Sequence, residues 1–304
     1  MTAPEETGAP RAGTIGAFVL VALIWGSTWL VIKDQISAVP PGWTVTWRFA
    51  LATVGMFALA LVRGDPLRLS GQAQALAAAV GLCQFFANFQ LVYRAEIHLT
   101  SGLVAVLFAL LLVPNALLSR LFLGSAIGAR FLIGSAVAIA GIALLLVNEA
   151  RLAPAGGSVP LGVSLALTAL LSASIANVLQ ATEAARRLPV VPLIAWAMLW
   201  GTLANAAFAW ATDGAPRLDP RPQYLAGIAY LGLIGSVVTF PLYFGLIRAM
   251  GAGRAAYNGV AVPVIAMTLS TLFERYRWTA LAAGGAVLAM TGLLIALSGR
   301  KDRA

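Results

Sequence analysis

The chain has 304 residues, of which 60% are hydrophobic and 10% are charged, and its mean hydropathy is +0.89. Because soluble globular proteins carry about 25% charged residues, this composition excludes a soluble protein. The net charge of +9 does not indicate a nucleic-acid partner, since the basic residues stand singly or in pairs between apolar runs. With one cysteine and one histidine, Cys83 and His98, an intrachain disulfide is excluded and we expect no metal or other cofactor.

The first dozen residues are polar, and we expect a disordered tail there. The apolar run that follows is too long for the core of a signal peptide, so we expect it to remain as the first membrane span. Apolar runs of about 20 residues, the length that crosses a bilayer as a helix, recur along the whole chain. They lack the alternation of barrel strands, so they predict an all-α protein with ten transmembrane helices. The predicted spans are 14–32, 42–62, 71–92, 99–122, 129–147, 159–182, 190–212, 223–247, 254–273 and 278–298.

The sequence also resembles itself at an offset of 151 residues. The segment 81–102 aligns without a gap with 232–253, and four of the six glycines in 81–146 fall on glycine. This self-similarity predicts two copies of a five-helix unit, at 14–147 and 159–298. Because five is odd, the second copy must be inverted in the membrane. Inverted repeats are common in transporters whose substrate site lies between the two copies.

Lysine and arginine are distributed unevenly over the two sets of loops. If the N-terminus is cytoplasmic, the cytoplasmic segments contain 12 of these residues and the outer segments 7, with one further arginine inside a span. Because cytoplasmic loops carry the excess of basic residues, this distribution predicts that both termini are cytoplasmic.

Several segments are typical of one family. They are LIWGSTWLVIK (23–33) in the first span, WRFALA (47–52) in the second, and the glycine-containing segments 121–146 and 272–297. Over essentially the whole chain, these features resemble the drug/metabolite transporter superfamily, specifically its ten-span EamA family, and within it bacterial amino-acid exporters of the YddG kind. The resemblance implies a bacterial inner-membrane protein in which spans one to four and six to nine surround a central cavity, while spans five and ten are outer braces.

Two amides are candidates for substrate binding. Gln84 and Asn88 lie four residues apart in the third span and therefore on one helical face. Amides that face lipid are costly, so we expect both to point into the protein. They either bind substrate or hydrogen-bond a neighbouring helix. Their aligned residues in the second repeat are Gly235 and Thr239, so this face is small or polar in both copies.

Aromatic residues indicate what the cavity could hold. Trp25 and Trp200 lie near the middle of their spans, and Tyr243 and Tyr257 lie in the eighth and ninth spans. Tryptophan offers an apolar wall and one N–H donor. As a set these side chains fit a cavity for apolar or aromatic ligands, although ordinary packing is the alternative for each one. The predicted cavity residues are Trp25, Gln84, Asn88, Trp200, Thr239, Tyr243 and Tyr257.

Prolines and glycines suggest where the helices could bend. Pro114, Pro241 and Pro263 interrupt the fourth, eighth and ninth spans, and each removes a backbone hydrogen bond. Gly102 and Gly253 stand at matching span starts. We interpret these five residues as candidate hinges, with static kinks as the alternative. Glycines seven residues apart in spans five and ten predict close helix packing; they are Gly134, Gly141, Gly285 and Gly292.

Two charged residues have no counterpart in the other repeat. Arg48 in span two aligns with Leu199, and Glu274 after span nine aligns with Leu123, where the family often has a glutamate. In the orientation above, both charges lie in the outer leaflet together with Glu96. We expect Arg48 to pair with Glu274 in one conformational state and so to form an outer gate. The alternatives are that Arg48 binds a substrate carboxylate or extends to water at the membrane surface.

Several function classes are excluded by what the sequence lacks. It has no nucleophile elbow, zinc-protease motif or phosphate-binding loop, so we expect no enzyme, and it has no charged ring or filter-like loop of a channel. The interiors of the predicted spans contain no Asp or Glu, which argues against cationic cargo. This absence also leaves no evident proton carrier, so facilitated transport and proton exchange both stay open. We therefore expect an exporter of small metabolites, above all amino acids including aromatic ones, that works by alternating access. A carrier of nucleotide-linked sugars or other neutral solutes is the alternative.

Overall fold

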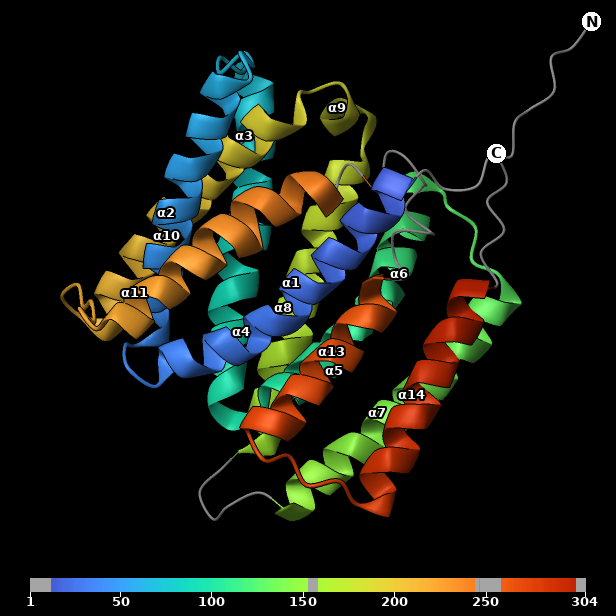
Figure 1. The fold of residues 1–304 in the computed structure, drawn as a ribbon. Coiled ribbons are helices and arrows are strands. Elements are labelled where there is room, and N and C mark those ends of the chain that lie inside the picture. Colours follow the sequence, from blue (N-terminus) through green and yellow to red (C-terminus); the bar gives the residue numbers. More distant parts are fainter. Residues whose placement is uncertain (1–11, 153–157, 244–245, 247–257, 299–304) are drawn as a thin grey trace, which may run out of the picture.

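The computed structural model describes residues 12–152, 158–243, 246 and 258–298. Within these ranges every regular element is helical (Figure 1). Two of the elements, η1 and η2, are π-helical segments that continue directly into α-helix. In chain order the elements are α1 (Ala12–Ile36), α2 (Pro41–Val62), α3 (Gly71–Val80), η1 (Gly81–Asn88), α4 (Phe89–His98), α5 (Ser101–Ala109), α6 (Leu112–Leu123), α7 (Ala129–Leu152), α8 (Val159–Ala181), α9 (Glu183–Arg186), α10 (Val190–Asp213), α11 (Pro222–Ala229), η2 (Tyr230–Val238), α13 (Asn258–Phe273) and α14 (Ala280–Ser298).

Nine helical runs in the described ranges are long and apolar enough to cross a membrane, and a tenth apolar helix, Ala261–Phe273, is shorter. The predicted fold class, an all-α membrane protein, is confirmed. The largest difference concerns the third span, which continues past residue 92 as one run, Gly71–His98. Tyr93 and Glu96, whose polarity suggested a loop, are instead buried inside the bundle. Burial against neighbouring helices therefore overrides the polarity of this segment.

Local sequence explains where several helices begin and end. Proline occupies the first turn of α2, where its missing N–H is not needed. The hydroxyl of Ser70 accepts a hydrogen bond from the Ala73 amide at 3.3 Å and so caps the start of α3. At the end of α6, Gly124 adopts φ +68°, a left-handed conformation that glycine reaches without strain.

The two π-helical segments occupy equivalent places in the two predicted repeats. At the offset of 151 residues, η1 falls on η2, and each packs against the second span of the other repeat. A Cβ atom on Gly81 would lie 3.2 Å from the Gly201 amide nitrogen of α10, and one on Gly232 would lie 3.0 Å from the Arg48 carbonyl oxygen of α2. π-Helical turns are frequent at functional sites, and both crossings join the two predicted repeats.

The helices α7 and α14 form a separate pair beside the rest of the bundle (Figure 1). Their glycines meet reciprocally: a Cβ on Gly134 would lie 2.6 Å from the Gly292 carbonyl oxygen, and one on Gly292 would lie 2.6 Å from the Gly134 carbonyl oxygen. Gly141 and Gly285 meet in the same way, at 2.6 and 2.8 Å. The structure thus confirms the predicted close packing of these two helices. The inverted arrangement of the two copies and their boundaries, 14–147 and 159–298, stay a prediction.

Candidate functional site

A pocket lies in the middle of the bundle. In the described part of the chain its walls come from α1, α2, η1, α4, α5, α6, α8, α13 and α14, and from residues 240 and 243. Its volume is about 190 Å³, and a buried water molecule needs only about 10–15 Å³ on this measure. The pocket therefore has room for a small organic molecule.

One side of the pocket is aromatic. The ring of Trp25 lies 5.6 Å from that of Phe240 and 4.8 Å from that of Tyr243, while the Trp25 indole N–H donates to the Gly235 carbonyl oxygen at 3.4 Å. A second aromatic pair lines the pocket: the ring of Trp29 lies 5.2 Å from that of Phe108. These rings form an apolar surface with few polar atoms, as expected for a site that binds an apolar side chain.

Amides supply the polar part of the pocket. Gln84 and Asn88 of η1 are both buried and both line the pocket. The Asn88 amide nitrogen donates to the Gln84 carbonyl oxygen at 3.4 Å, and the Asn88 side-chain oxygen has no hydrogen-bond partner among the described residues. On the opposite wall, the side-chain oxygen of Asn115 accepts from Ser174 and Asn177 at 2.7 and 3.3 Å. An unsatisfied buried acceptor costs free energy, and a ligand donor would remove that cost.

Arg48 brings a buried positive charge to the pocket wall. The residue is only 2% exposed, and its guanidinium donates to the Tyr93 hydroxyl at 3.1 Å and to the Ser236 hydroxyl at 3.3 and 3.4 Å. It also lies over the rings of Phe89 and Phe49, at 4.5 and 5.2 Å. No ion pair involves Arg48 in the described ranges. A buried arginine with only neutral partners is a place where an anionic ligand group is favoured.

One end of the bundle, where α4 ends and α5 begins, is closed by buried residues. We call it the far end. Lys33 of α1 donates to the carbonyl oxygens of Glu96 and Leu99, the latter at 2.9 Å, and so caps the end of α4. Glu274, which follows α13, accepts hydrogen bonds from the amide and hydroxyl of Ser101. Glu96, Leu99 and Ser101 are all buried. These contacts tie α1, α4, α5 and α13 together at one end of the bundle.

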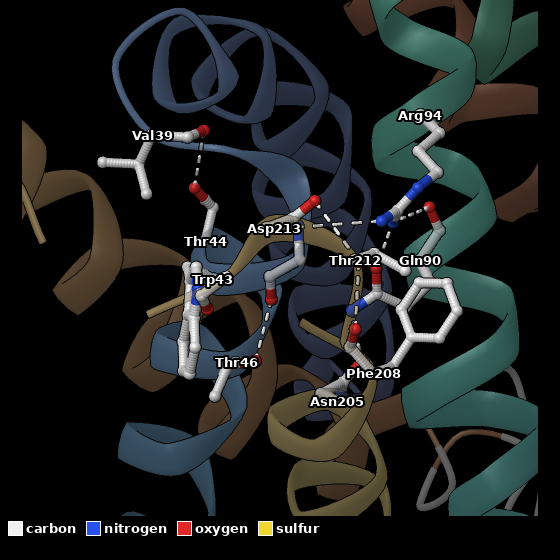
Figure 2. Close-up of polar contacts among 12 residues, drawn as sticks. Val39, Trp43, Thr44, Thr46, Gln90, Arg94, Asn205, Phe208, Thr212 and Asp213 are labelled. Atoms are coloured by element: carbon white, nitrogen blue, oxygen red, sulfur yellow. Dashed lines mark hydrogen bonds and ion pairs between the residues drawn. The ribbon is translucent and has the colours of Figure 1, made fainter. Parts of the chain in front are cut away.

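A second polar network links α4 to α10 near the same end (Figure 2). The Gln90 amide donates to the Asn205 side-chain oxygen at 2.7 Å, and the Asn205 amide donates to the Phe85 carbonyl oxygen at 2.9 Å. One turn further along α4, Arg94 lies 3.9 Å from Asp213 and stacks over the Phe208 ring at 4.9 Å. The amides satisfy each other, so this network holds helices together rather than offering groups to a ligand.

Outside the spans, Tyr276 lies beside this closed end. Burial of its hydroxyl, together with the negative charge of Glu149, raises the pKa of Tyr276 above its usual value. Tyr276 is therefore a neutral hydrogen-bonding group at physiological pH.

Comparison with known proteins decides the class to which this arrangement belongs. The sequence profile of the EamA-like transporter family matches residues 13–147 and, a second time, residues 160–298. The chain belongs to the EamA-like transporter family. It is a multi-pass membrane transporter and not an enzyme, as the sequence resemblance predicted.

Three similar bacterial proteins cover most of the EamA chain. Protein PagO of Salmonella typhimurium is 25% identical, over 85% of this chain and 84% of its own. The probable amino-acid metabolite efflux pump of Escherichia coli K12 is 26% identical, over 94% and 95%. The inner membrane transporter YedA of the same strain is 29% identical, over 88% and 86%. A solved crystal structure with 19% sequence identity has a TM-score of 0.69 over 94% of this chain and 97% of that one, which establishes the shared fold.

The EamA structure brings together only part of the predicted cavity. Trp25, Gln84, Asn88 and Tyr243 all line the pocket. Thr239 does not line it; its hydroxyl is buried and donates to the Ile234 carbonyl oxygen of its own helix. Trp200 also does not line it. The residue is 39% exposed on the outside of α10, with its indole N–H bonded to Gln74 at 3.1 Å. Tyr257 lies outside the described residues.

The pair expected at the outer gate is not formed in this conformation, and the gate stays a prediction. Arg48 and Glu274 do not pair, because Arg48 is engaged by Tyr93 and Ser236 while Glu274 is engaged by Ser101. Burial of Arg48 also rules out the alternative that it extends to water. Arg48 belongs to the pocket and Glu274 to the closed far end, so the two residues have separate surroundings.

Four of the five candidate hinges lie in the described residues. The fourth span is broken between α5 and α6 at Leu110–Leu111, just before Pro114, whose ring cannot donate to the Leu110 carbonyl. Pro241 follows η2, and Pro263 lies within α13 and lines the pocket. Gly102 is a close-packing position, since a Cβ there would lie 2.9 Å from that of Ser270 on α13. Gly253 lies outside the described residues, and the hinge role of all five stays a prediction.

Glu96 is the functional candidate that the sequence analysis missed. The predicted third span, 71–92, was too short, because α4 continues to His98 and Glu96 lies in the last turn of this run, fully buried. The signal was present in the chain: Glu96 lies four residues after Val92 and eight after Asn88, on the face that α4 and η1 turn toward the pocket.

Proposed function

We propose that this EamA transporter exports small metabolites with a carboxylate group, above all amino acids including aromatic ones, by alternating access. The observation that carries the proposal is the buried Arg48 guanidinium on the wall of a pocket whose other walls are aromatic rings, amides and aliphatic side chains. The similarity to a probable amino-acid metabolite efflux pump of Escherichia coli supports the same substrate class.

The pocket offers a complementary group for each part of an amino acid. The planar guanidinium of Arg48 presents donors that match a carboxylate, and exchanging two neutral hydroxyl acceptors for a charged one strengthens the hydrogen bonds. The free side-chain oxygen of Asn88 accepts a hydrogen bond from the substrate ammonium group. The rings of Trp25 and Tyr243 provide the surface on which an aromatic side chain packs.

The proposed conformation opens toward the cytoplasm. The lining extends to Leu293 and Leu297, in the last two turns of α14, whereas Lys33 and Glu274 hold the helices together at the opposite end. With both termini in the cytoplasm, as the lysine and arginine distribution predicts, this is an inward-facing state in the bacterial inner membrane. Export then requires the far end to open, and breaks such as that before Pro114 are where the helices would bend.

Counterflow into proteoliposomes tests the substrate class. Purified protein is reconstituted in liposomes preloaded with one unlabelled amino acid, and uptake of the same labelled compound is measured for each of the twenty. We expect exchange of aromatic amino acids and no exchange of the corresponding decarboxylated amines, because the amines cannot engage Arg48. No exchange with any amino acid would overturn the proposal, and exchange of a nucleotide-linked sugar instead would favour the alternative cargo.

Cysteine labelling tests the orientation. Single cysteines placed next to Arg63 and next to Arg217, in a background with Cys83 replaced by serine, lie at opposite ends of the bundle. We expect an impermeant maleimide added outside intact cells to label only the cysteine beside Arg217. Labelling of the cysteine beside Arg63 from outside would reverse the proposed orientation.

A further inference from the structure

The carboxyl group of Glu96 lies in an environment that does not suit a negative charge. The residue is 0% exposed, and neither carboxylate oxygen has a hydrogen-bond partner among the described residues. A buried ionised carboxylate without hydrogen-bond donors or a paired cation is strongly unfavourable. Neutralising the group by protonation removes most of this cost.

The neighbouring charges are engaged elsewhere. Lys33 of α1 donates to backbone carbonyl oxygens, including that of Glu96 itself, and not to the carboxylate. Arg48 of α2 donates to Tyr93 and Ser236. Glu274, beyond α13, adds a second negative charge, and α5 and α8, which also pack on α4, carry no charged residue. The carboxyl of Glu96 therefore has no ionic partner in the closed end.

A metal ion does not fit this position. In the described part of the chain, no group of three or more His, Cys, Asp or Glu side chains is arranged so that it could hold one. A proton, unlike a metal ion, can bind to a single carboxylate. The surroundings of Glu96 therefore fit a proton and not a metal ion.

The position of Glu96 connects it both to the pocket and to the closure of the bundle. Val92, one turn earlier on α4, lines the pocket, and so does Ile32, the neighbour of Lys33 on α1. The Glu96 carbonyl oxygen accepts the hydrogen bond by which Lys33 ties α1 to the end of α4. Opening the far end separates these helices and brings water to the carboxyl group.

We propose that Glu96 is a proton-binding site and that its protonation is required for the far end to close. This inference rests on the alternating access of the proposed function. When the far end opens, the carboxylic acid releases its proton to water on that side. Before the end closes again, the carboxylate takes a proton from a hydronium ion on the same side and leaves water behind. Each closure of the far end thus binds one proton.

The direction of the pH effect follows from this balance. Because the closed form holds a proton that the open form releases, acid favours the closed far end and alkali favours the open one. One linked proton changes the ratio of open to closed protein by as much as about tenfold per pH unit. The groups that modulate the effect are Lys33, Arg48, Tyr93 and Glu274, with Glu149 behind Lys33 and Glu274.

Accessibility of a cysteine at the far end measures this linkage without any substrate. Leu99 is 2% exposed at the end of α4, so Leu99→Cys in a Cys83→Ser background reports whether water reaches the closed end. The full-length protein is labelled with a maleimide from about pH 5.5 to about pH 8.5, a range that spans the usual titration of perturbed carboxyl groups. Each rate is divided by that of Leu99→Cys/Cys83→Ser/Glu96→Gln at the same pH, which removes the pH dependence of the thiol.

We expect this ratio to rise about tenfold or more toward high pH, because glutamine mimics the protonated carboxyl and holds the far end closed. Glu96→Asp, which keeps a titratable group, should keep the pH dependence even if the glutamine variant folds poorly, and it is compared directly with the parent. Glu183→Gln, an exposed change on α9, is the matched control and should behave as the parent. A ratio that does not change with pH, or a pH dependence lost in Glu96→Asp, would overturn the proposal.

The labelling assay and the transport assay test the proton site and the substrate class separately. A pH-dependent ratio without amino-acid exchange would overturn the substrate class but leave the proton site standing. Amino-acid exchange with the same pH profile in the parent and in Glu96→Gln would overturn the proton site but leave the transport proposal standing.

Discussion

The two halves of the molecule share a backbone plan but differ in chemistry. Both contain a π-helical segment in the third span of the unit, and both present a glycine where that segment crosses the second span of the other half. Yet Gln84 and Asn88 in η1 align with Gly235 and Thr239 in η2, and Arg48 aligns with Leu199. The comparison shows that the repeat preserves the positions where backbones touch, whereas the arginine and the two amides of the first half have no counterpart in the second half.

The largest effect is expected where the two halves are equivalent. Gly141→Leu and Gly292→Leu occupy aligned positions and should be equally damaging, because each drives a side chain into the backbone of the partner helix. Overpacking costs about 1–3 kcal/mol even where side chains can move aside, so we expect loss of most folded protein in gel filtration of detergent extracts. Gly284→Leu on α14 is the control, since a Cβ there meets no atom within 4 Å. Normal yield of Gly141→Leu would contradict the observed helix crossing.

The next largest effect is expected where the halves differ in charge. Arg48→Leu should reduce amino-acid exchange about 10- to 100-fold, because a hydrogen bond to a charged group contributes about 1.5–3 kcal/mol. Leu199→Ala, at the aligned position, should retain exchange within about twofold. Arg48→Lys should retain more activity than Arg48→Leu, since lysine keeps the positive charge but lacks the planar guanidinium with its paired donors. Equal losses at Arg48 and Leu199, with both proteins folded, would show that the two positions act only in packing.

A smaller effect is expected for the amide face. Asn88→Leu should reduce exchange about 5- to 10-fold while the protein stays folded, because one neutral hydrogen bond contributes about 0.5–1.5 kcal/mol. Thr239→Val, the near-isosteric change at the aligned position, should have little effect, since that hydroxyl bonds its own helix and does not reach the pocket. Loss of folded protein in Asn88→Leu would instead indicate that the amide holds helices together.

The smallest effect is expected at a position that the sequence placed wrongly. Trp200→Phe should change exchange and yield by less than about twofold, because exposed positions contribute little to stability. Its aligned residue is Phe49, which is buried against Arg48 and Phe85. Phe49→Leu should therefore reduce exchange more than Trp200→Phe does. The opposite order, measured in the same liposome assay, would place the substrate at α10.

The sequence by itself predicted the membrane fold and the close packing of α7 on α14, and four of its seven candidate cavity residues line the pocket. Apolar run length follows from bilayer thickness, and glycine spacing and amide faces follow from the pitch of a single helix. These properties are local, so they can be derived from the order of residues along the chain.

Only the tertiary structure decided which side of a helix faces the pocket and which charges meet. Trp200 and Trp25 both lie near mid-span, but packing turns one outward and the other inward. Arg48 could have met Glu274, yet Tyr93 and Ser236 lie closer. The predicted third span ends before Glu96, whereas the helix in the structure continues past it to His98. Each outcome depends on residues brought together from distant parts of the chain, because burial and pairing are properties of the assembled helices and not of any one of them.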